Sequence, residues 1–152
     1  MQKENKSFIY IIVILTRRRQ MMPLKIELKP RESIIIGDAL ITNDDERTRF
    51  YIEGNVPILR EKFILRENEA NTPSKRIYFI VQQMYLAKDS SKLNSFYIEY
   101  VRDLQKAAPS LKPLIDPISE SILNNDFYGA IKNAAALVKR EDEVFGELFN
   151  QL

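Results

Sequence analysis

Carboxylate, lysine and tyrosine side chains are the groups of this sequence that could do enzyme chemistry, because it contains neither cysteine nor histidine. That composition excludes thiol nucleophiles, disulfides, zinc fingers and imidazole bases. The run Asp44-Asp45-Glu46 has the residue types of a metal or acid–base site, but loop tips are commonly acidic and no calcium-loop pattern surrounds it. The four glycines are far apart, which excludes a glycine-rich nucleotide loop. We therefore expect no enzyme activity, no metal and no cofactor.

Basic side chains alternate along three segments that have the pattern of β-strands, and they form the candidate binding site. Every second residue of a strand faces the same side of its sheet. If the first and last strands are neighbours, their cations make one patch that could contact RNA phosphates. A half-solvated sheet also needs charged outward residues, so the pattern alone leaves both interpretations open. The candidate RNA-binding residues are Lys25, Lys29, Arg47, Arg49, Arg60 and Lys62.

The charge balance limits any nucleic-acid site to a local patch. The whole chain has a net charge of +2. Residues 1–20 hold five basic residues and one acidic residue, so the remainder has 18 basic and 20 acidic residues and a net charge of −2. A protein that binds nucleic acid mainly by counterion release is strongly basic. The absence of cysteine suits a reducing compartment, so we expect a cytoplasmic protein.

The first 20 residues are expected to be an extension that precedes the folded protein. Eight apolar residues run from Phe8 to Leu15, whereas a transmembrane helix needs roughly 20. Three arginines follow where a signal peptide has small residues. The pair Met21-Met22 stands directly before the first strand, which indicates a start codon assigned too far upstream. We expect no membrane contact.

The hydrophobic pattern changes near residue 70, which predicts an α+β fold. Residues 23–66 alternate with period two between turn residues, which is typical of a small antiparallel β module of four or five strands, the last over 56–65. Thr72-Pro73 marks the start of a helix that continues to about residue 88. Residues 72–150 form a helical region, in which Ser90 or Ser91 caps a second helix. Three prolines limit residues 109–125 to a turn and a short helix.

The last predicted helix begins after the cap residue Asp126 and carries an apolar stripe with steps of four and three. The stripe consists of Phe127, Ile131, Ala134, Val138, Phe145 and Leu148. It is interrupted at Glu141 and is too short for a coiled coil, so we expect it to fold back on the helix at 73–88. Four of its members are also candidate partner-interface residues: Ile131, Val138, Phe145 and Leu148. The acidic run 141–143 is interpreted as a solvated helix face.

In order and spacing, four segments resemble the FlbT family of bacterial regulators of flagellin synthesis. They are LKIELKPRESIIIGDALI, RTRFYIEGNVPILREKFIL, NTPSKRIYFIVQQMYL and DFYGAIKNAAALVKRE. The resemblance runs from about Pro23 to about Val144, and TPSKRIYF and ILRE are its most specific pieces. It implies a post-transcriptional repressor that binds the 5′ untranslated region of flagellin mRNA, blocks translation and promotes mRNA decay. A companion protein, FlaF, opposes the family.

The strands show a weaker similarity to the carbon storage regulator CsrA, an intertwined β dimer that binds GGA-containing mRNA leaders. The segment LKIELKPRESIIIGD is similar to its opening strand and turn, and VPILREKFI resembles its closing strand. This places Arg60 where CsrA has an RNA-contacting arginine. The first-strand arginines of CsrA become Leu28 and Lys29, and a glycine becomes Arg31. The similarity implies that Arg60, Lys25 and Lys29 contact phosphates or a guanine edge.

Partner expectations follow from the same two resemblances. A few cations bind weakly alone, so a homodimer that offers two patches is expected, with the helical region supplying the dimer contact or a contact with FlaF. The alternative is a protein-interaction module or chaperone that acts through flagellin or FlaF without direct RNA contact.

Overall fold

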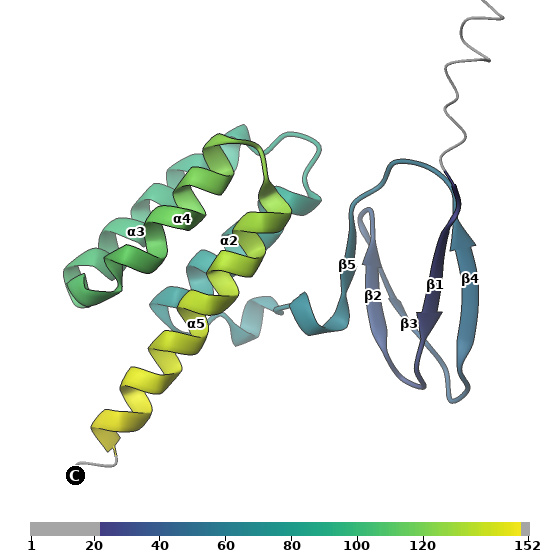
Figure 1. Cartoon of the computed structure of the whole chain (residues 1–152), viewed down its shortest axis with the longest axis horizontal. Coiled ribbons are helices and arrows are strands. Elements are labelled where there is room, and N and C mark those ends of the chain that lie inside the picture. The colour runs from purple at the N-terminus through teal and green to yellow at the C-terminus, as the bar shows by residue number, and fades with distance from the viewer. Residues whose placement is uncertain (1–21, 150–152) are drawn as a thin grey trace, which may run out of the picture. The chain divides into compact units, whose positions relative to one another are not determined.

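The computed structural model describes residues 22–149, with side chains described for 22–147, so the predicted extension lies outside the described residues. Contacts within the chain separate two units, which are described one at a time (Figure 1). The first unit contains the described residues 22–32 and 42–56, and the second contains 33–41 and 57–149. The fold is α+β as predicted, and strands contribute to both units.

The first unit is an antiparallel ladder of β1 (Leu24–Leu28) and β4 (Thr48–Ile52). Ile26 and Leu28 are buried on one face, while Lys25 and Glu27 alternate with them and are exposed. This confirms the period-two interpretation of the opening strand.

A tight turn and one asparagine hold the end of this ladder. The N–H of Glu32 donates to the carbonyl of Lys29 at 3.2 Å, with Pro30 and Arg31 between them. Arg31 has a φ of 62°, the left-handed conformation that a type II turn requires at this position. The amide Nδ2 of Asn43 donates to the carbonyls of Leu28, Lys29 and Glu46. The two chain segments that leave the ladder are thereby tied together.

The second unit contains a three-stranded sheet in the order β3-β2-β5, made of Ala39–Thr42, Ser33–Ile36 and Ile58–Arg60. The predicted turn at Gly37 is confirmed, with a φ of 65° and its N–H donating to the carbonyl of Pro57 at 2.9 Å. Strand β2 pairs antiparallel with β5, and Ile35 lies opposite Leu59.

The prediction of a strand over 56–65 is wrong, because the chain leaves the sheet after Arg60. Two short 3-10 helices follow, η1 (Glu61–Phe63) and η2 (Glu67–Glu69). The backbone here is bonded by side chains of α2 (Pro73–Leu86). The hydroxyl of Tyr78 donates to the carbonyl of Phe63 at 2.7 Å, and the amide of Gln82 bonds both the N–H and the carbonyl of Leu65. These bonds replace a strand neighbour.

Four α-helices make up the rest of the second unit: α2, α3 (Asn94–Ala107), α4 (Lys112–Leu123) and α5 (Phe127–Phe149). Helix α2 begins as predicted, since the hydroxyl of Thr72 accepts from the N–H of Lys75. The predicted serine cap of the second helix is wrong: the 3-10 turn η3 (Ser91–Leu93) precedes α3, and neither helix start has a side-chain cap.

Helix α4 is longer than its prolines indicated. After the 3-10 turn η4 (Pro109–Leu111), it runs for 12 residues with Pro113 in its first turn, where an N–H has no intrahelical partner anyway. Pro117 removes one hydrogen bond from the helix interior. Burial of Ile115 and Ile118 in the core offsets that loss.

The core lies between the helices. Its fully buried members include Ile77 and Val81 of α2 and Ile131, Ala134 and Leu137 of α5. Helix α5 packs beside α2, as expected (Figure 1). Within residues 22–149, no helix has the length and apolar content needed to cross a membrane.

The interpretation of residues 141–143 as a solvated face is wrong for Glu141, which is only 2% exposed. Its carboxylate accepts hydrogen bonds from the hydroxyl of Thr72 and from the N–H of Ser74 at 3.1 Å. The interruption of the apolar stripe is therefore a buried carboxylate that caps the start of α2, where the helix dipole favours negative charge. Asp142 and Glu143 are exposed as predicted.

Candidate nucleic-acid interface

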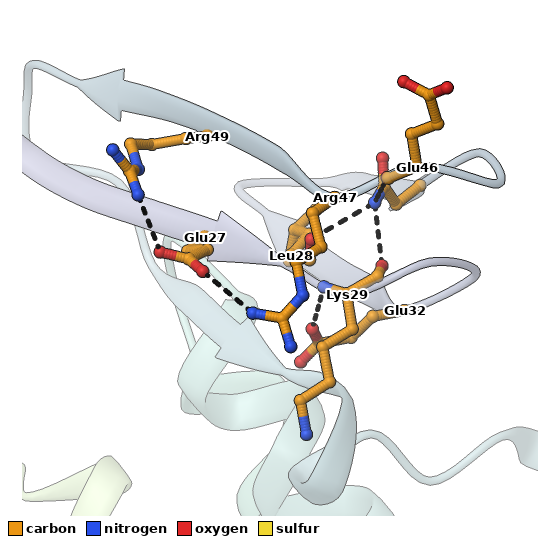
Figure 2. A network of polar contacts seen from close by, with 8 residues as sticks. Glu27, Leu28, Lys29, Glu32, Glu46, Arg47 and Arg49 are labelled. Carbon is orange, nitrogen blue, oxygen red and sulfur yellow. Dashed lines mark hydrogen bonds and ion pairs between the residues drawn. The ribbon is translucent and has the colours of Figure 1, made fainter.

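One face of the β1–β4 ladder collects four of the six predicted cations. Lys25 lies opposite Tyr51, and Glu27 lies opposite Arg49. Lys29 and Arg47 continue the same alternation just beyond the paired residues, at one end of the ladder (Figure 2). We call this surface the ladder face; it consists of Lys25, Glu27, Lys29, Arg47, Arg49 and Tyr51, all of them exposed.

The carboxylate of Glu27 orients two of these cations. Arg47 Nη1 lies 3.3 Å from Oε1 and Arg49 Nη2 lies 3.4 Å from Oε2 (Figure 2). Exposed ion pairs of this kind contribute about 0–1 kcal/mol, so an incoming anion can compete for the guanidinium groups. Each guanidinium carries five donors and keeps several for a second acceptor. Glu27 therefore pre-orients the arginines without neutralising the face.

The predicted acidic run is part of the turn beside this face. Asp45 forms an ion pair with Arg31 at 2.6 Å, and the carbonyl of Asp44 accepts from the N–H of Arg31 at 3.0 Å. In the part of the chain that the structure describes, no group of three or more acidic side chains is arranged to hold a metal. In this turn the carboxylate of Asp45 pairs with Arg31, whereas Asp44 and Glu46 contribute backbone carbonyls.

Tyr51 was missed by the sequence analysis. Its side chain is 64% exposed and shares the ladder face with Arg49. An exposed aromatic ring among cations is a platform on which an unpaired base can stack. The signal was present in the sequence, because Arg47, Arg49 and Tyr51 follow one another at every second position.

Arg60 and Lys62 belong to the second unit, whereas the other four predicted cations belong to the first. The condition for a single patch was that the first and last strands are neighbours, but β1 pairs with β4 and β5 pairs with β2. Arg60 is partly buried opposite Ile34. The placement of Lys62 on a strand is also wrong: it lies in η1, with Nζ 4.8 Å from the ring centre of Phe63.

Some of the predicted partner-interface residues on α5 are buried in the core instead. Ile131 is fully buried and Val138 is partly buried against the other helices, which corrects the expectation that Ile131 faces a partner. Phe145 is exposed. Leu148 lies within α5, but its side chain is outside the described residues. A partner surface around Phe145 stays a prediction.

Comparison with known proteins gives a consistent result. The family described as "Flagellar protein FlbT" matches residues 24–145. The chain is 47% identical over 123 residues to "Probable flagellum biosynthesis repressor protein FlbT" of Rhodopseudomonas palustris, covering 81% of this chain and 98% of that protein. It is 47% identical over 127 residues to a Bradyrhizobium diazoefficiens protein, "Probable flagellum biosynthesis repressor protein FlbT 1", covering 83% and 87%. "Flagellum biosynthesis repressor protein FlbT" of Caulobacter vibrioides is 31% identical over 132 residues, covering 84% and 92%. No solved structure matches the chain at a significant level.

Proposed function

The chain belongs to the FlbT family, and from that premise we propose that it represses flagellum biosynthesis by binding messenger RNA in the cytoplasm. Its target is the 5′ untranslated region of flagellin mRNA. The bound protein blocks translation and promotes decay of the message. No catalytic step of its own is part of this function.

The ladder face is the observation that supports RNA contact. Four cations and one exposed tyrosine come from the two paired segments, and the acidic residues of the same alternation are Glu27, between the arginines, and Glu53, two residues after Tyr51. Lysine and arginine side chains position an RNA strand through its phosphates, while an aromatic ring stacks a base. A single-stranded leader offers phosphates and unpaired bases at the same time. Because one small face binds weakly, we include a homodimer that presents two faces in the proposal.

Repression follows from where the protein binds. A protein on the leader beside the ribosome-binding region excludes the ribosome, and an untranslated message is open to nucleases. The weak resemblance of the strands to CsrA, a leader-binding β dimer, comes from the sequence alone; as part of this proposal it suggests that leader binding precedes ribosome exclusion.

The test is a titration of labelled flagellin mRNA leader, beside a scrambled RNA, with wild type and with the double variant Arg47→Gln/Arg49→Gln. For single strands, the slope of log K against log salt changes by about 0.7 per phosphate contact, so the double variant should lower it by about 1.4. The matched control, Arg102→Gln/Lys106→Gln, removes two exposed charges from α3. Equal losses in the two double variants would refute a role for the ladder face.

A second candidate function is a protein-interaction module that acts through flagellin or FlaF. Strand β3 lies at the edge of its described sheet, and its Leu40 and Ile41 are exposed. Leu40 also lines a groove of about 560 Å³ together with Leu86 and Leu93. Exposed edge strands pair with extended peptides. Loss of flagellin or FlaF binding in Leu40→Asp, with leader binding unchanged, would favour this candidate.

A further inference from the structure

Three aromatic rings of the second unit lie in contact with one another. We call them the aromatic platform: Phe63 of η1, Tyr85 of α2 and Tyr128 of α5. The rings of Phe63 and Tyr128 are edge to face, with centres 5.9 Å apart and planes at 76°. The ring centre of Tyr85 is 6.0 Å from that of Tyr128. Three separate elements thus supply one cluster.

Hydrogen bonds hold the Tyr85 ring and the backbone of Phe63 in place. The hydroxyl of Tyr85 donates to the carbonyl of Ile58 at 3.0 Å and accepts from its N–H at 3.3 Å. The carbonyl of Phe63 accepts from the hydroxyl of Tyr78 at 2.7 Å. Phe63 and Tyr85 are partly buried against the core, whereas Tyr128 is 41% exposed. The platform therefore has a fixed base and an exposed ring.

Two lysines lie over the platform. Lys132 follows Tyr128 by one helical turn and places Nζ 4.7 Å from the centre of its ring. Lys62 places Nζ 4.8 Å from the ring centre of Phe63. Both side chains are exposed, and cation–π contacts at exposed sites are weak enough to be exchanged for a ligand. Lys139, also exposed, lies seven residues beyond Lys132, on the same side of α5.

The start of α5 does not itself provide the anion site. Its cap residue Asp126 already accepts from the N–H of Gly129 at 2.9 Å. A Cβ on Gly129 would lie 2.0 Å from Asp126 Oδ2, so the glycine makes room for the capping carboxylate. The ring of Tyr128 and the lysines are the groups left to meet a ligand.

An exposed ring beside lysines fits a single-stranded nucleic acid better than a protein. Lysine is depleted in protein–protein interfaces, and two lysines would have to be desolvated there. A nucleic-acid strand instead uses both groups, since its bases stack on aromatic rings and its phosphates bind the cations.

We propose that Tyr128 stacks an unpaired base of the mRNA leader, while Lys132 and Lys62 bind the phosphates that flank it. This inference rests on the proposed function and adds a second RNA contact, on a different unit from the ladder face. It gives Lys62 a role at the platform.

The experiment uses the full chain, with the labelled leader and a short adenine-rich single strand titrated in parallel at several salt concentrations. Loss of one stacked base weakens binding by roughly 5- to 150-fold, so Tyr128→Leu should do so at every salt concentration with the salt slope unchanged. Tyr128→Phe, which keeps the ring, should bind like wild type. Lys132→Gln should lower the slope by about 0.7. The matched control is Phe96→Leu, which removes an exposed ring from α3.

The outcomes separate the two proposals. If wild type prefers the leader to a scrambled RNA but Tyr128→Leu binds both probes as tightly, the platform is refuted and the proposed function stands. If wild type shows no preference for the leader, the proposed function fails, and the adenine-rich strand still tests the platform. If Tyr128→Leu binds RNA like wild type but no longer represses in cells, the platform binds a protein partner and this inference is overturned. Should Tyr128→Leu fail to fold, an unchanged salt slope in Lys132→Gln overturns it.

Discussion

The buried carboxylate of Glu141 should be a large single contribution to the stability of the helical unit. Glu141→Ala removes the acceptor of the buried Ser74 N–H and of the Thr72 hydroxyl. A buried donor left unsatisfied costs about 1–3 kcal/mol, and loss of a negative charge at a helix N-terminus costs about 0.3–1 kcal/mol. We expect the free energy of unfolding to fall by roughly 2–4 kcal/mol.

Related substitutions separate the two costs. Glu141→Gln loses the charge but keeps one oxygen to accept from the Ser74 N–H, and its NH2 group can donate to the Thr72 hydroxyl in place of the second oxygen, so it should cost about 1 kcal/mol. Glu141→Leu restores the apolar stripe but leaves both donors unsatisfied, so it should lie between the glutamine and alanine variants. The matched control is Glu143→Ala, an exposed residue two positions away whose partner Arg140 is also exposed. It should change stability by less than about 0.5 kcal/mol.

The assay is urea denaturation monitored by the far-UV circular dichroism signal of the helices. A shift of the midpoint with an unchanged m-value reports a change in stability. A double-mutant cycle with Thr72→Val isolates the hydroxyl–carboxylate bond, and contacting groups of this kind couple by about 0.5–3 kcal/mol. The capping role of Glu141 is wrong if the free energies of unfolding of Glu141→Ala and Glu143→Ala differ by less than about 0.5 kcal/mol, or if the cycle shows no coupling.

Three further outcomes are expected. Burial raises the pKa of Tyr78 from 10.0 to about 12, so the stability that its neutral hydroxyl contributes is complete below pH 10 and is lost as the pH rises toward 12. Urea titrations on both sides of pH 10 should show that the free energy of unfolding falls less with pH in Tyr78→Phe than in wild type. The fall that remains in the variant is expected from Tyr97, because burial also raises its pKa. Arg31→Gly should be more stable than Arg31→Ala by about 1 kcal/mol in urea, because only glycine adopts the positive φ without strain; equal stabilities would contradict the turn assignment. Ser74→Ala should raise the thermal midpoint and gain about 1 kcal/mol, because Ser74 Oγ is buried and has no partner among the described residues; a destabilised variant would mean that the hydroxyl is bonded.

Local patterns predicted the elements whose causes are local. The alternation of Lys25, Ile26 and Glu27 gives the faces of β1, and Thr72-Pro73 gives the start of α2. The end of β5 depends instead on Tyr78 and Gln82, which lie far along the chain and bond the backbone after Arg60. Periodicity within residues 56–65 carries no information about those bonds, so the predicted strand was too long.

The sequence predicted most residues of the candidate site but not which of them lie together. Alternation shows which cations share a face of one strand, but it does not show which strands pair. The pairing of β1 with β4 brings Arg47 and Arg49 to Glu27, whereas Arg60 lies on β5, which pairs with β2. Glu141 is a comparable case, because its partner Thr72 is 69 residues away. The sequence did mark the anomaly, since a carboxylate interrupted an otherwise apolar stripe.

Charge and geometry together account for how a nearly neutral chain could select one RNA. Residues 21–152 have a net charge of −2, so long-range attraction to phosphate is weak and nonspecific binding is disfavoured. Each proposed surface adds an exposed tyrosine to a few cations, which requires an unpaired base as well as phosphates. A duplex offers no free base to either tyrosine. Under the proposal, selectivity for an unstructured leader comes from the unpaired bases that each tyrosine requires, and a leader that contacts both surfaces gains affinity through effective concentration.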